Sequence, residues 1–171
     1  VLYRAEDNSA QGIGKRTSRI GYAESADGVT MKRLDSPVLF PGGDEFESIE
    51  CPGGCEDPRV AMTEDGLYVM LYTAWNRKTP RLAVATSKDL KNWTKHGLAF
   101  EKAYDGRFAR IATKSASILT KVKGGKLVID KVDGKYFMYW GEYAVHAATS
   151  DNLTDWYPCL LYTSPSPRDR T

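Results

Sequence analysis

The chain has 171 residues, a formal net charge of +2 at pH 7 and 42% hydrophobic residues. This near-neutral balance argues against nucleic acid as a partner, and no apolar run of 18 residues predicts a membrane span. Cys51 and Cys55 are closely spaced with no second pair, so we expect no metal site. A disulfide between them stays open, although unpaired thiols fit the spacing better.

Strand-like segments recur along the chain from its first residue. Val1-Leu2-Tyr3 opens inside such a run without an initiating methionine, and it fits the end of a truncated copy of a repeat. Segments 20–28, 82–93 and 145–156 share the core Ala-Glu/Thr-Ser, with serines 62 and 63 residues apart. A fixed period of this kind indicates a repeat architecture.

Two Asp-Gly pairs recur in step with these serines. Asp65-Gly66 precedes the run 67–72, and Asp133-Gly134 precedes 135–139. Glycine supplies the positive φ that a tight hairpin needs, so each pair predicts a turn between two strands. Each copy then contains four strands in about 60 residues, which is the content of one β-propeller blade.

No segment predicts a long helix. We expect an all-β chain that is a fragment of a β-propeller with about two and a half blades; a β-sandwich with coincidental spacing is the alternative. Each blade packs on two neighbours, so we do not expect such a fragment to be stable alone.

The copies differ where their second strand ends. Glu6, Trp75 and Glu142 occupy equivalent positions there, yet their chemistry is unlike. A site assembled from several blades at the mouth of the channel would show this difference. Ordinary loop variation would show it too.

The segment Gly53–Val60, GGCEDPRV, enters the first strand of the central copy. Its glycines permit a close backbone approach, and Pro58 is expected to hold Asp57 in extended geometry. Strand alternation would then place Arg59 on the same face as Asp57, aimed at the channel. A solvated charged turn is the alternative.

The equivalent segment of the next copy, 112–117, places Lys114 among small residues, which suits the approach of a polar ligand. A surface lysine is the plainer interpretation. The end of the chain, Cys159–Asp169, resembles a translated sequencing adapter. We therefore expect residues 1–158 to form a partial domain truncated at both ends, and 159–171 to be a non-native tail.

Several long motifs together resemble glycoside hydrolase family 130. They are YRAED, TSRIGYAES, GGCEDPRV, ATKSASI, DGKYFMYWGE and the run Tyr72–Gly97. The resemblance implies that residues 1–158 are the catalytic domain of a five-bladed β-propeller acting on β-mannosides. The family contains inverting phosphorylases, which use phosphate, and inverting hydrolases, which use water. This chain is more similar to the hydrolases, particularly those acting on β-1,2-linked mannosides.

The resemblance also implies roles for single residues. Asp57 would be the proton donor, acting through a sugar hydroxyl, and Glu142 the candidate base; a second candidate glutamate would fall beyond residue 158. No cofactor is expected, and inorganic phosphate would be a co-substrate only in a phosphorylase. The β-mannoside oligosaccharide would be bound by Arg4, Asp7, Arg19, Arg59 and Lys114, with Trp75 either a platform for a sugar face or a core aromatic.

The chemistry of inversion agrees with these assignments. An acid and a base are needed about 6.5–9.5 Å apart, and the acid must stay protonated near neutral pH. An Arg59–Asp57 pair would oppose this, so we expect Arg59 to point to the sugar or to Glu56. A phosphorylase and a propeller that only binds glycan are the alternatives. The Asp57 and Glu142 pair argues against the second, and a carboxylate at 142 would repel phosphate.

Overall fold

The structure is a computed structural model that describes residues 1–12 and 14–165, with side chains described to residue 160. In this part of the chain, strands dominate and the one helix is the single turn α1 (Glu47–Glu50), which confirms the all-β prediction. The strands are β1 (Leu2–Glu6), β2 (Ser18–Glu24), β3 (Lys32–Arg33), β4 (Gly54–Met62), β5 (Tyr68–Trp75), β6 (Pro80–Ser87), β7 (Thr94–Leu98), β8 (Ala116–Ile118), β9 (Thr120–Lys123), β10 (Lys126–Ile129), β11 (Lys131–Val132), β12 (Lys135–Trp140), β13 (Ala144–Ser150) and β14 (Tyr157–Pro165).

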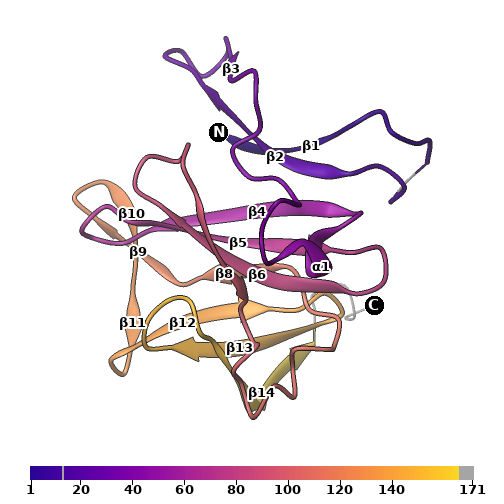
Figure 1. Ribbon diagram of the computed structural model, residues 1–171. Helices are drawn as coiled ribbons and strands as arrows, with labels where there is room; N and C mark the ends of the chain where they lie inside the picture. Colours follow the sequence, from indigo (N-terminus) through magenta and orange to yellow (C-terminus); the bar gives the residue numbers. More distant parts are fainter. Residues whose placement is uncertain (13, 166–171) are drawn as a thin grey trace.

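Consecutive strands form three successive antiparallel groups (Figure 1). The first is β1–β2–β3, the second β4–β5–β6–β7, and the third β12–β13–β14 with β8 and β11 both paired to β12. One parallel bridge, Ser18 to Gly54, joins the first group to the second. The second group is a meander of four strands in sequence order, which is the content that the repeat predicted for one blade.

The repeated serine forms the corner between the third and fourth strands. The hydroxyl of Ser87 accepts hydrogen bonds from the amides of Asp89 and Leu90 at 3.1 and 2.9 Å. Asp89 then accepts from the amides of Lys91 and Asn92 at 2.9 and 2.7 Å. These side chains satisfy the backbone of the turn locally, as Ser and Asp commonly do.

The same corner occurs in the other two copies. Ser150 and Asn152 reproduce the pattern after β13, and Ser25 and Asp27 reproduce it after β2. The indole of Trp156 donates to the Leu153 carbonyl at 2.9 Å, matching the Trp93 to Leu90 bond at 3.0 Å. The shared sequence core therefore specifies a turn.

Both Asp-Gly pairs form the predicted turns, between β4 and β5 and between β11 and β12, with Gly66 at φ 89° and Gly134 at φ 80°. A further hairpin, β9–β10, was not predicted. It turns at Gly124-Gly125 and separates β8 from β11, so the strand position beside β12 is interrupted.

Two buried cores flank the central sheet. Val69 and Leu71 of β5 belong to a cluster that includes Met138 and Trp156 of the third group. The intervening residues Met70 and Tyr72 belong to a second cluster with Ile20 of the first group. Both faces of β5 are therefore buried, as expected for a strand group stacked between two others.

A buried ion pair anchors the long segment between β3 and β4. Glu50 of α1 is fully buried, accepts a hydrogen bond from the Tyr72 hydroxyl at 2.8 Å and pairs with Lys95 at 2.6 Å. Lys95 also pairs with Asp44 at 2.7 Å. Burial raises the pKa of Glu50, and the two hydrogen bonds oppose this effect. The anchor fixes the chain just before GGCEDPRV.

The cysteines are all unpaired. Cys55 is buried in the second core, and burial raises the pKa of its thiol. At the other end of the chain, the backbone of β14 pairs with β13 through Pro165, inside the segment predicted to be a tail. Residues 166–171 lie outside the described part, and the non-native tail stays a prediction. In the described residues, no helix has the length and hydropathy of a membrane span.

Candidate functional site

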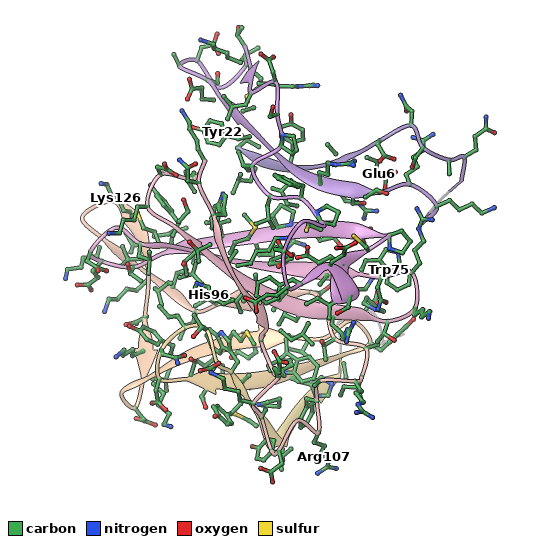
Figure 2. The ribbon with its side chains drawn as sticks, in the orientation of Figure 1. Glu6, Tyr22, Trp75, His96, Arg107 and Lys126 are labelled. Atoms are coloured by element: carbon green, nitrogen blue, oxygen red, sulfur yellow. The ribbon has the colours of Figure 1, made fainter. Side chains whose placement is uncertain are left out.

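All the predicted site residues except Arg59 lie near one edge of the sheets. β1 ends there at Glu6 and β5 at Trp75, and both side chains lie on the right in Figure 2. Pro80 pairs with Trp75, and its carbonyl accepts a hydrogen bond from the Thr113 amide at 2.9 Å. Lys114 follows directly, and its carbonyl accepts from the Gly141 amide at 3.1 Å. This chain of backbone contacts links the second group to the loop that carries Glu142.

Asp57 lies on a β-bulge at this edge. Glu56 pairs with Thr73 and Arg59 with Leu71, so Asp57 and Pro58 together oppose the single residue Tyr72. Asp57 has φ 50°, so the prediction of extended geometry before Pro58 is wrong. Asp tolerates this left-handed region better than most residues, and bulges beside active sites re-aim side chains. Because the bulge adds a residue, alternation no longer places Arg59 on the face of Asp57.

Arg4 connects β1 to this bulge. Its guanidinium lies 2.6 Å from Glu6, 2.9 Å from Glu56 and 3.4 Å from Asp57. Arg4, predicted to bind sugar, is thus surrounded by three carboxylates. Burial raises the pKa of Glu56, and the charge of Arg4 opposes this effect.

Gly53 and Gly54 bring the start of β4 against its neighbours. A methyl group on Gly53 would lie 2.2 Å from Cδ1 of Trp75, and one on Gly54 would lie 2.1 Å from the Ser18 carbonyl oxygen. The predicted close backbone approach is therefore present. Trp75 is half-buried against Gly53, which gives it a packing role; a platform for a sugar face stays a prediction.

Asp7 and Arg19 pair with each other at 2.8 Å. Asp7 also accepts hydrogen bonds from the hydroxyl and amide of Ser9 and from the amide of Thr17. The Ser9 hydroxyl and Arg19 hold the pKa of Asp7 well below its ordinary range. These contacts organise the loop between β1 and β2, and contact of Asp7 and Arg19 with sugar stays a prediction.

Glu142 forms an ion pair with Lys114 at 3.1 Å. Lys114 precedes β8 and Glu142 follows β12, and these two strands are paired, with Ala116 opposite Trp140. The structure thus brings together one predicted base and one predicted binding residue. Their charges offset each other at the edge of the sheet.

Arg59 lies elsewhere, in the wall of a cavity of about 780 Å³. Neighbouring lining residues include Pro58, Val60, Ser117 and Leu127. Among the described residues Arg59 forms no ion pair, and the alternative partner predicted for it, Glu56, is engaged by Arg4. The sugar stays its predicted partner.

Two contributors to the site were missed from the sequence. Ser18 is fully buried and connects Arg4 to Glu56, and Glu56 itself had no predicted role. Ser18 lies inside the TSRIGYAES motif, and that motif was the available signal.

Known proteins match the chain over nearly its whole length. The family model described as beta-1,4-mannooligosaccharide phosphorylase (Glyco_hydro_130) matches residues 1–160. A 1,2-beta-oligomannan phosphorylase from Thermoanaerobacter sp. (strain X514) is 33% identical, over 98% of this chain and 50% of that protein.

Solved structures match the fold closely. A glycosyl hydrolase from Bacteroides ovatus is 60% identical with a TM-score of 0.93, over 96% of this chain and 46% of that one. A second structure has the description "The GH130 family of mannoside phosphorylases contains glycoside hydrolases that target beta-1,2 mannosidic linkages in Candida mannan". It is 63% identical with a TM-score of 0.91, over 92% of this chain and 44% of that one.

The fold and these matches define the class of the chain: an all-β fold shared with proteins that are described as glycoside phosphorylases and hydrolases. Within that class, the chain belongs to glycoside hydrolase family 130, which confirms the resemblance of its motifs. The chain spans about half the length of the curated relatives it matches.

Proposed function

We propose that the protein containing this chain is an inverting β-mannosidase that hydrolyses β-1,2-linked manno-oligosaccharides. The observation that carries this proposal is Asp57, whose carboxylate is 41% exposed on a bulge at the site edge. A group that donates a proton to substrate must be both fixed and accessible. The 63% identity to the structure described for beta-1,2 mannosidic linkages supports the linkage.

In the proposed mechanism Asp57 donates its proton to a sugar hydroxyl, which passes a proton to the glycosidic oxygen. The bond between the anomeric carbon and that oxygen breaks. Glu142 takes a proton from water, whose oxygen attacks the anomeric carbon from the opposite side and inverts it. Lys114 keeps the Glu142 carboxylate in place through their 3.1 Å contact.

A phosphorylase is the second candidate because both curated relatives are phosphorylases. Lys114 is a cation that could attract phosphate. It is already paired with Glu142, however, and that carboxylate would repel the incoming anion. The balance of charge therefore favours water as the nucleophile.

The test uses the full-length protein with β-1,2-mannobiose, with and without inorganic phosphate. We expect mannose as the product, at a rate that phosphate does not change. Phosphate-dependent release of mannose 1-phosphate would instead establish the phosphorylase, and binding without either product would establish a glycan-binding module.

Asp57→Asn and Glu142→Gln test the assigned roles. Each removes a proton-transfer group, so each should lower the rate by at least about 100-fold. Turnover near the wild-type rate in either variant would remove that residue from the mechanism. Thermal unfolding of each variant controls for loss of the fold.

A further inference from the structure

The Arg4 guanidinium is shared unequally among its three carboxylates. One nitrogen, Nη2, lies 2.6 Å from Glu6 and 2.9 Å from Glu56. The other, Nη1, lies 3.4 Å from Asp57. Charge-assisted hydrogen bonds are strongest at about 2.7–2.9 Å, so the contact with Asp57 is the weakest of the three.

Ser18 fixes this arrangement. Its hydroxyl accepts a hydrogen bond from Nε of Arg4 at 3.1 Å and donates one to Glu56 at 3.0 Å. Arg4, Ser18 and Glu56 therefore close a ring of three contacts, and Asp57 makes only the longer contact with Nη1. Burial supports this reading, since Ser18 is fully buried and the Glu56 side chain is 13% exposed, against 41% for Asp57.

We propose that Glu56 is a positioning residue that draws the Arg4 guanidinium toward itself, keeps the contact of Arg4 with Asp57 long, and thereby lets Asp57 keep the proton it donates. The inference rests on the proposed function, because it concerns the same acid. Without the Glu56 charge, the guanidinium would be free to move closer to Asp57. An arginine contact stabilises an ionised carboxylate, so Asp57 would lose its proton at lower pH.

The other charged groups on β1, β2 and β4 do not replace Glu56. Glu6, on β1, contacts the same nitrogen of Arg4 but is 31% exposed, so solvent screens its charge more strongly. Asp7, directly after β1, and Arg19 of β2 neutralise each other. Arg59, on Asp57's own strand, lines the cavity instead.

The test compares the pH dependence of kcat/KM for β-1,2-mannobiose in the full-length protein and its variants. The alkaline limb of this profile reports loss of the proton from the catalytic acid. Glu56→Gln should move the alkaline limb to lower pH by about one unit. Ser18→Ala, which loosens the ring but keeps every charge, should move it in the same direction by less.

Glu64→Gln is the matched control. Glu64 pairs with Lys123 at 2.6 Å beside the Asp65-Gly66 turn, at the opposite end of the sheet. The alkaline limb of the Glu64→Gln profile should therefore coincide with that of the wild type. A Glu64→Gln profile that shifts as far as Glu56→Gln would overturn the inference, because the effect would then be one of general charge.

The outcomes separate this inference from the proposed function. If the wild type is active and the Glu56→Gln variant is folded, an alkaline limb that stays in place or moves to higher pH in this variant overturns the role of Glu56 alone. If Glu56→Gln does not fold, Ser18→Ala decides by the same criterion. A wild type that cleaves no β-mannoside, or an Asp57→Asn variant with full activity, overturns the proposed function and this inference with it.

Discussion

Replacing Gly54 by alanine tests how the start of β4 is seated against β2. The residue has φ 113°, and a methyl group there would lie 2.1 Å from the Ser18 carbonyl oxygen and 2.5 Å from the Ser18 amide nitrogen. Both obstacles are backbone atoms, so no side-chain rotation can relieve the clash. The two strands must separate where their parallel bridge joins the first group to the second.

The cost has two parts. Positive φ costs a non-glycine residue about 1–2 kcal/mol, and overpacking a buried contact adds about 1–3 kcal/mol. Gly134→Ala is the matched control, because Gly134 also has positive φ, 80°, but open space around its Cβ position. Gly54→Ala should therefore lower the free energy of unfolding by about 1–3 kcal/mol more than Gly134→Ala.

Urea unfolding of the full-length protein and both variants measures this difference by linear extrapolation. Equal losses in the two variants would refute the reasoning, because the strain would then come from φ alone. Gly54→Ala should also lower kcat/KM, since Glu56 and Asp57 follow within three residues.

Two further predictions concern the buried anchor and the chain itself. Lys95→Met leaves Glu50 buried without its cation and should destabilise the folded state by about 3–5 kcal/mol at neutral pH. Burial raises the pKa of Glu50, so the folded state binds a proton at Glu50 more tightly than the unfolded state does. This proton binding stabilises the folded state at low pH, and the stabilisation is lost as pH rises through the pKa of Glu50 in the folded state. Urea unfolding should therefore show a smaller deficit for Lys95→Met near pH 4.5 than near pH 7.5, and an equal deficit would contradict this account. The 171-residue chain alone should release no mannose from β-1,2-mannobiose, and any turnover by it would show that the half-length chain suffices.

Sequence reasoning succeeded where the structure depends on neighbouring residues. The Asp-Gly turns and the serine corners are made by hydrogen bonds among residues a few positions apart, so their spacing predicted the strands. The β9–β10 hairpin carried an equally local signal in Gly124-Gly125, flanked by strand-forming residues. It was missed because it interrupts a strand position that the repeat led us to expect as continuous.

The arrangement around Asp57 could not be predicted in the same way. A bulge is defined by how many residues oppose it on the partner strand, and that count is fixed by the pairing of β4 with β5. The Arg4–Glu56 contact joins residues 52 positions apart on β1 and β4, with Ser18 of β2 between them. The periodicity of the sequence does not predict which carboxylate an arginine will contact.

The serine corners have a consequence for the opposite edge of the sheets. Ser87 pairs with the first residue of β5, and Ser150 lies opposite Tyr136 near the start of β12, so both corners are remote from Trp75 and Glu142. Each corner is complete within its own copy and needs nothing from the loops at the far end. Those loops are free to differ from copy to copy while the sheets stay the same. A repeated scaffold can in this way carry a single asymmetric site, in which each copy contributes a different chemical group.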